Sequence, residues 1–213
     1  MQVRRGTRPL RRSVTNVALR REILVFSEGE RTEEDYLLFW SRRHRDVLVH
    51  LDDFRGPPRQ LIDRAVSTKK RSEKEARRGR GRAYDEVWCI FDVDDHPDIH
   101  EVRTIARDHG VQLAITNPCL ELWFVLHFEP RTAYTDRKAA QRASLVLLGC
   151  GKALTDQALA RLEARHSIAR THAKTLDEKH SGDGSPAGSN PSSGVWALVD
   201  QIRETVDGRT DGD

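Results

Sequence analysis

The chain has 213 residues, a length typical of one domain, and 37% of them are hydrophobic while 32% are charged. Its three cysteines, Cys89, Cys119 and Cys150, lie far apart without a CxxC pair, which argues against a disulfide framework and against a structural zinc site. The N-terminus lacks an apolar secretory signal, and no apolar stretch approaches the ~18 residues of a membrane span, so we expect a soluble cytoplasmic protein without membrane contact.

The net charge is only +3, but basic residues are concentrated in two segments. Residues 1–22 contain seven arginines and a single acid. A second basic run, residues 69–82, contains only two acids. Such runs form either solvated surface or a stripe that binds phosphate groups. On the second interpretation, the residues of this run that contact nucleic acid are Lys69, Lys70, Arg71, Arg77, Arg78, Arg80 and Arg82.

Along the chain, residues 1–21 are predicted to form a flexible basic arm, residues 22–206 a folded domain and residues 207–213 a polar tail. The first half of the domain alternates apolar runs with amphipathic segments. We therefore predict strands at 22–27, 47–51 and 84–92, and helices at 32–45 and 61–76. Thr32 is a candidate N-cap, because the acids that follow it suit the positive end of a helix dipole.

The second half continues with a helix at 98–109, a strand at 111–116 and a turn at 117–119. The apolar block 120–127 fits a helix or a strand by its period, and we favour a helix. Helices are also predicted at 136–148, 155–176 and 195–206, with a turn-rich loop at 181–194. This order predicts an α/β fold whose mainly parallel central sheet is flanked by helices, with extra helices toward the C-terminus.

Carboxylates follow two of the predicted strands. Glu28 precedes Gly29, which lets another group approach the backbone, although a surface acid at a strand end is common. Asp92 and Asp94 are two residues apart, so in an extended segment both can bind one Mg²⁺ or Mn²⁺ ion. The carboxyl ends of parallel strands share one edge of a sheet, where a cation would offset the repulsion between the clusters. The sequence therefore predicts one metal site.

Other polar residues are candidates for supporting roles. Glu30 and Glu33 either join the site or cap the helix, and capping is favoured for Glu33; Asp95 is expected to be peripheral. Glu121 opens a helix after a strand, which places it at the same sheet edge as a candidate catalytic residue. Asn117 precedes that helix, where it could orient Glu121 or bind phosphate.

Histidine and aromatic residues point mostly to the core. His127 lies six residues after Glu121, so on a helix the two face opposite sides and do not share an ion. His127 is more typical of a core or capping histidine. The large aromatic residues within apolar periodicity are expected in the core rather than as base-stacking platforms; they are Trp88, Trp123, Phe124 and Trp196. No Walker loop is present, so we do not expect ATP hydrolysis by this chain.

A Glu after the first strand and Asp-x-Asp after a later strand resemble the Toprim domain. The chain more narrowly resembles the RloB-like family, which is found beside restriction and abortive-infection loci, over about residues 22–206. The segments that carry this likeness are LVFSEGERTE (24–33), FDVD (91–94), TNPCLELWFVLHF (116–128) and NPSS (190–193). The resemblance implies that Glu28 is a general acid/base or metal ligand and that Asp92 and Asp94 bind metal. It also implies an ATPase partner encoded nearby.

The leading hypothesis is a Mg²⁺- or Mn²⁺-dependent endonuclease in phage defence, with the basic run holding the backbone of the substrate. Either DNA or RNA fits the sequence, and resemblance to other Toprim effectors favours RNA or tRNA. One alternative is a non-catalytic nucleic-acid-binding or regulatory subunit that works with the ATPase. Another is a metal-dependent phosphotransferase acting on a small nucleotide. Whether the chain forms a homo-oligomer is left open.

Overall fold

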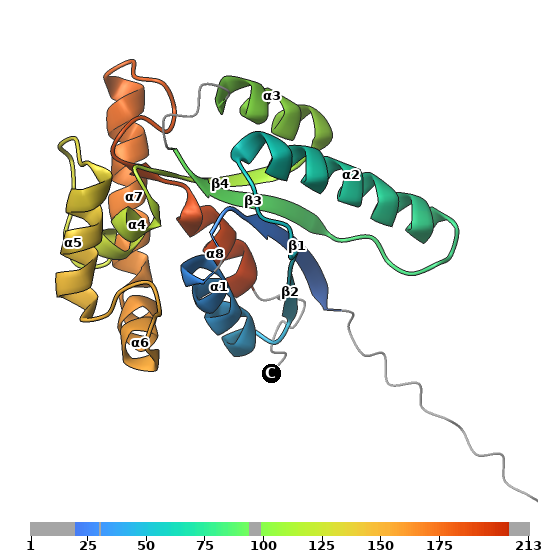
Figure 1. Ribbon diagram of the computed structural model, residues 1–213, viewed down its shortest axis with the longest axis horizontal. Helices are drawn as coiled ribbons and strands as arrows, with labels where there is room; N and C mark the ends of the chain where they lie inside the picture. Colours follow the sequence, from blue (N-terminus) through green and yellow to red (C-terminus); the bar gives the residue numbers. More distant parts are fainter. Residues whose placement is uncertain (1–19, 30, 94–98, 205–213) are drawn as a thin grey trace, which may run out of the picture.

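The computed structural model describes residues 20–29, 31–93 and 99–204, and in these ranges the chain forms a five-stranded sheet with eight helices (Figure 1). The strand order is β2-β1-β3-β4-β5, in which the first four strands are parallel and β5 is antiparallel to β4. The strands are β1 (Arg21–Ser27), β2 (Val47–Leu51), β3 (Glu86–Asp92), β4 (Gln112–Asn117) and β5 (Ser192–Ser193). The prediction of an α/β fold with a mainly parallel sheet is confirmed.

Helices cover both faces of the sheet (Figure 1). They are α1 (Thr32–Arg43), α2 (Pro58–Arg77), α3 (Ile99–His109), α4 (Leu120–Leu126), α5 (Arg137–Leu148), α6 (Asp156–Ala164), α7 (His166–Gly182) and α8 (Val195–Arg203). Helices α2 and α3 lie on one face, and α1 and α8 lie on the other. Helices α4 to α7, called here the helical extension, gather beside β4. No helix in the described ranges is both long and apolar enough to cross a membrane.

The two faces of the sheet create two cores. Alternate residues of a strand point to opposite faces, so Leu24 and Phe26 pack with α2 and α3. Their neighbours Ile23 and Val25 pack with α1, α8 and the helical extension. Because both faces are covered, β1 and β3 each contain an unbroken apolar run, residues 23–26 and 87–91, as expected for central parallel strands.

The start of α1 differs from the prediction that Thr32 is its N-cap. The helix begins at Thr32, and Arg31 occupies the cap position without a side-chain hydrogen bond to the helix. The Thr32 hydroxyl instead donates to the carbonyl of Lys152, 2.9 Å away. This contact ties the start of α1 to the turn that follows α5, and the hydroxyl is therefore used for tertiary packing.

Two further predictions in the C-terminal half are corrected. The single helix predicted at 155–176 is two helices, α6 and α7, which meet at Arg165. The change of direction buries Leu162 of α6 and Ala169 of α7 in the same core. The predicted loop at 181–194 contains the end of α7 and the short strand β5, whose Ser192 pairs with Asn117. Glu30, Asp94, Asp95, residues 1–19 of the predicted arm and the whole predicted tail lie outside the described residues.

Candidate active site

Three of the predicted site carboxylates lie at the carboxyl edge of the parallel strands. Strands β1 and β3 are neighbours, and the Glu28 backbone N–H donates to the Ile90 carbonyl at 3.2 Å, which places Glu28 beside the end of β3. Asp92 ends β3, and Glu121 lies in the first turn of α4. Glu28, Asp92 and Glu121 line one cavity of about 460 Å³. Their convergence follows the predicted geometry, and their catalytic role stays a prediction.

Asp92 is held firmly in this cavity. The Thr116 hydroxyl of β4 donates to Asp92 Oδ1 at 2.6 Å, and Arg137 Nη2 of α5 lies 3.3 Å from Asp92 Oδ2. Burial raises the pKa of Asp92 to about 7, while the hydrogen bond from Thr116 and the charge of Arg137 oppose that rise. The negative charges of Glu33 and Glu121 add to it. Ionised Asp92 is therefore a poorly solvated charge that a cation would stabilise.

Glu33 is a fourth carboxylate of the cavity, although the sequence favoured a capping role for it. Its carboxylate accepts a hydrogen bond from its own backbone N–H, and burial, Glu121 and Glu28 together raise its pKa. The carboxylate also lies so close to Gly29 that a Cβ at position 29 would collide with it. Gly29 therefore allows the close approach that the sequence predicted for this glycine.

Three cations and one amide complete the lining. Arg31 precedes α1, Arg137 and Gln141 lie on α5, and Lys152 follows α5. With all groups ionised, the lining carries four carboxylates and three cations, a net charge of −1. Sequence reasoning missed Arg137 and Lys152 because both are far in the sequence from the two acidic motifs. Only the fold brings them to the carboxylates.

The lining suits a hard divalent cation by its chemistry, since carboxylate oxygens are the ligands that Mg²⁺ and Mn²⁺ prefer. In the described ranges, however, no three His, Cys, Asp or Glu side chains are arranged around a common point that could hold an ion. Asp94, the third ligand predicted from the sequence, lies outside those ranges. The oxygen-rich lining and the raised pKa of Asp92 are the features that fit a cation.

Asn117 has partners other than the expected Glu121 or phosphate. Its amide nitrogen donates to the Gly188 carbonyl at 3.0 Å, and its side-chain oxygen accepts from Asn190 at 3.1 Å. Asn190 in turn accepts from the Thr135 backbone N–H at 2.9 Å. Asn117 is not among the residues that line the acidic cavity. It joins the end of β4 to the segment that contains β5.

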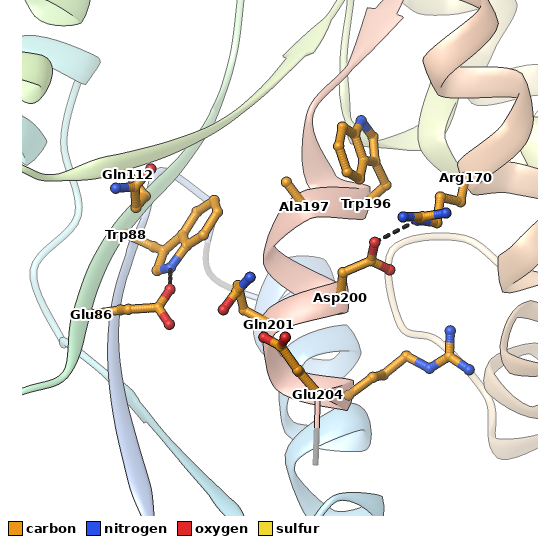
Figure 2. A pocket seen from close by; sticks show the side chains of 10 residues that line it. Glu86, Trp88, Gln112, Arg170, Trp196, Ala197, Asp200, Gln201 and Glu204 are labelled. Atoms are coloured by element: carbon orange, nitrogen blue, oxygen red, sulfur yellow. Dashed lines mark hydrogen bonds and ion pairs between the residues drawn. The ribbon is translucent and has the colours of Figure 1, made fainter. Parts of the chain in front are cut away.

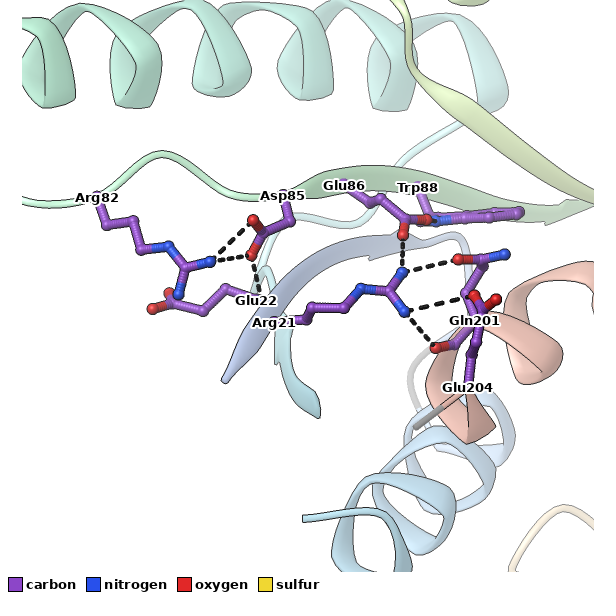
Figure 3. Close-up of polar contacts among 8 residues, drawn as sticks. All are labelled: Arg21, Glu22, Arg82, Asp85, Glu86, Trp88, Gln201 and Glu204. Carbon is purple, nitrogen blue, oxygen red and sulfur yellow. Dashed lines mark hydrogen bonds and ion pairs between the residues drawn. The ribbon is translucent and has the colours of Figure 1, made fainter. Parts of the chain in front are cut away.

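The basic run at 69–82 lies at the opposite edge of the sheet. Lys69 Nζ donates to the carbonyls of His109 and Gly110, at 3.0 and 2.6 Å, just before β4 begins. Arg82 pairs with Asp85 at 2.8 Å and donates to the Arg20 carbonyl at 2.6 Å, beside the starts of β3 and β1 (Figure 3). No residue of the run lines the acidic cavity, and its role in holding the backbone of nucleic acid stays a prediction.

His127 belongs to the core. Its side chain is fully buried, its Nδ1 lies 2.8 Å from the Trp123 carbonyl, and burial lowers its pKa to about 3. Trp123 is also buried and donates to the Tyr36 hydroxyl at 2.8 Å. Trp88 and Phe124 are buried too, while Trp196 is partly buried against the core. The core assignment of these residues is confirmed.

A larger cavity of about 830 Å³ lies between α8 and the starts of β3 and β4 (Figure 2). Most of its polar groups already contact one another. Glu86 accepts from Trp88 Nε1 at 2.8 Å and pairs with Arg21, and Asp200 pairs with His166 and Arg170 (Figures 2 and 3). Because these charges are mutually neutralised, the smaller acidic cavity is the better candidate for chemistry.

Comparison with known families agrees with the motifs. A family model described as RloB-like protein matches residues 23–202, which is most of the chain. The resemblance indicated by the sequence is thereby confirmed. Comparisons with the curated proteins and with the solved structures gave no match.

Proposed function

The chain belongs to the RloB-like protein family, and we propose that it is a Toprim-like, divalent-metal-dependent nuclease that acts in phage defence. The observation that carries this proposal is the gathering of Glu28, Asp92 and Glu121 in one cavity at the carboxyl edge of a parallel sheet. Open α/β sheets bind ligands at this edge. A nuclease of this kind would meet its substrate in the cytoplasm, and that location is part of the proposal.

In this proposal Glu28 and Asp92 hold a Mg²⁺ or Mn²⁺ ion together with Asp94, whose assignment rests on sequence alone. The bound ion would stabilise negative charge that develops on the scissile phosphate. Glu121 and Glu33 face the same space, and the pKa of Glu33 is already raised. A carboxylate with a raised pKa is better matched to accepting a proton from water near neutral pH. Glu33 is therefore suited to serve as the base, and Glu121 lies in the same cavity as a further candidate.

The first test measures cleavage by the wild type, Glu28→Gln and Asp92→Asn. Separate pools of DNA, RNA, tRNA and nucleotides are the substrates, with Mg²⁺ or Mn²⁺ present. Both variants should lose cleavage by at least about 100-fold, because each removes a charge that the reaction needs. Asp108→Asn, which changes an exposed acid on α3, should cleave normally. Circular dichroism checks that all variants are folded. Full activity in both cavity variants would refute this assignment.

A second candidate function is a non-catalytic nucleic-acid-binding or regulatory subunit. It is favoured by four basic residues of α2 that form no ion pair among the described residues and suit contact with a phosphate backbone: Lys70, Arg71, Lys74 and Arg77. The family relationship supports a search for an ATPase in the neighbouring reading frame. If the chain is such a subunit, co-purification with that ATPase should be required for cleavage. Cleavage by the isolated chain, lost in Glu28→Gln, would exclude this alternative.

A further inference from the structure

The acidic cavity is bounded by α5 and by the turn that follows it. Arg137 is the first residue of α5, Gln141 lies one helical turn later, and Lys152 lies four residues beyond the end of the helix. The hydrogen bond from the Thr32 hydroxyl to the Lys152 carbonyl fixes this turn against the start of α1. The helical extension therefore adds a basic wall opposite the carboxylates at the ends of the strands.

The wall and the carboxylates are electrostatically complementary to a bound phosphate and cation. Arg137 already contacts Asp92, and its guanidinium has five N–H groups, so it can bind more than one acceptor. Lys152 has an exposed side chain and takes part in no ion pair among the described residues. A divalent cation would offset much of the negative charge of the carboxylates, so that Arg137 and Lys152 could face the negative charge of a phosphodiester.

The volume of the cavity restricts what can enter. At about 460 Å³ it falls within the range of small-molecule sites, so it has room for one nucleotide, and a nucleotide can enter it whole only where it is not paired in a duplex. We propose that Arg137 and Lys152 hold a phosphate of an unpaired nucleic-acid strand against the carboxylates. The substrate would then be single-stranded or locally unpaired. The binding part of this inference is independent of cleavage, whereas its catalytic meaning rests on the proposed function.

The test uses a labelled trinucleotide, DNA or RNA, because so short a strand cannot reach the basic run at the far edge of the sheet. Fluorescence anisotropy with Ca²⁺ compares the full-length wild type with Arg137→Gln and Lys152→Ala. Each variant should bind about tenfold more weakly, since each loses a charged hydrogen bond to phosphate. Lys138→Ala changes an exposed lysine that does not line the cavity, and it should bind as the wild type does.

Competition identifies the occupant. An unlabelled single strand should displace the trinucleotide, and so should a mononucleotide, because one nucleotide fills the cavity. A blunt duplex long enough to stay paired should displace it poorly. A Mn²⁺-induced thermal shift should be unchanged in Lys152→Ala, which separates phosphate binding from loss of the cation. Normal binding by both variants, or displacement by the duplex as effectively as by the strand, would overturn the inference.

Cleavage assays distinguish this inference from the proposed function. If no substrate is cut but Lys152→Ala still loses the trinucleotide, phosphate binding stands and the nuclease proposal fails. If substrate is cut with the same KM by the wild type and both variants, the nuclease proposal stands and the role of Arg137 and Lys152 fails. A raised KM with a smaller change in kcat for Lys152→Ala supports both.

Discussion

At the scale of single residues, Asp92 shows how a site can oppose the stability of its own fold. Its pKa rises from an ordinary value of 3.8 to about 7, mainly because the carboxyl group is buried. The folded state therefore binds the proton more tightly than the unfolded state does. As the pH rises from about 4 to 7, the free energy of unfolding of the wild type should fall, because the folded protein must ionise a poorly solvated group.

This behaviour predicts that Asp92→Asn is more stable than the wild type at pH 8 in EDTA, by roughly 2–6 °C in Tm. The difference should shrink near pH 4, where Asp92 is neutral in the folded wild type. Adding Mg²⁺ or Mn²⁺ at pH 8 should raise the Tm of the wild type more than that of the variant. Differential scanning fluorimetry measures the Tm of both proteins at pH 8 in EDTA, near pH 4, and at pH 8 with the added cation. A variant less stable than the wild type at pH 8 would contradict the argument.

Some site residues could be located from the sequence and others could not, and the difference has a physical reason. Glu28 and Asp92 follow apolar runs, and the parallel sheet places all such strand ends at one edge. Arg137 and Lys152 carry no such signal, because their position depends on how the helical extension packs. Thr32 was misassigned as a cap because its tertiary acceptor, the Lys152 carbonyl, is distant in sequence.

At the scale of elements, strongly patterned strands and helices could be predicted and weakly patterned ones could not. Strands β1 and β3 contain short continuous apolar runs, which are typical of buried strands. Helix α2 has apolar residues at helical spacing, which indicates an amphipathic helix. Strand β5 has two serines and no apolar pattern. It forms because Asn190 and Asn117 hold its segment against β4. The break between α6 and α7 likewise depends on the packing of both helices in the core, and the local sequence carries no signal for it.

Helix α2 also presents a basic stripe, defined here as Lys70, Arg71, Lys74, Arg77 and Arg78. At 100° per residue these side chains fall within an arc of about 120°, on the side away from the buried residues of α2. Within the described ranges, Arg78 pairs with Glu75, and the other four residues of the stripe have no ion pair. A surface of unneutralised cations is suited to the phosphate backbone of nucleic acid.

We therefore predict that Lys70→Glu/Lys74→Glu lowers the affinity for a long nucleic acid by about tenfold or more and reduces its salt dependence. The matched control is Lys138→Glu/Arg142→Glu, which reverses two exposed charges on α5 at the same helical spacing. Filter binding at two salt concentrations gives both quantities. Trinucleotide binding in the acidic cavity should be unchanged in both double variants. If both double variants lost the same affinity for long nucleic acid, the loss would reflect overall charge and not the basic stripe.

At the scale of the whole molecule, the acidic cavity lies at the carboxyl ends of the parallel strands, whereas Lys69, which immediately precedes the basic stripe, contacts the chain just before β4 begins. Helix α2 runs along the sheet between these two edges (Figure 1). Strand β1 has seven residues, so the two edges of the sheet are roughly 20 Å apart. Arg20 and Arg21 lie at the same edge, where β1 begins and Arg82 contacts the Arg20 carbonyl. The fold thus separates a surface suited to general backbone contacts from a cavity suited to a single phosphate.

This separation predicts a dependence on substrate length. A strand that spans both sites gains affinity because binding at one raises the effective concentration at the other. For single strands of about 3 to about 30 nucleotides, the affinity should rise with length and level off once both sites are reached. Anisotropy titrations with Ca²⁺ measure the affinity for each strand of this series.

In Lys70→Glu/Lys74→Glu the rise of affinity with length should be largely lost, while the shortest strands bind normally. In Lys152→Ala the shortest strands should lose most, because they depend on the cavity alone. An affinity independent of length in the wild type would mean that one strand does not engage both sites.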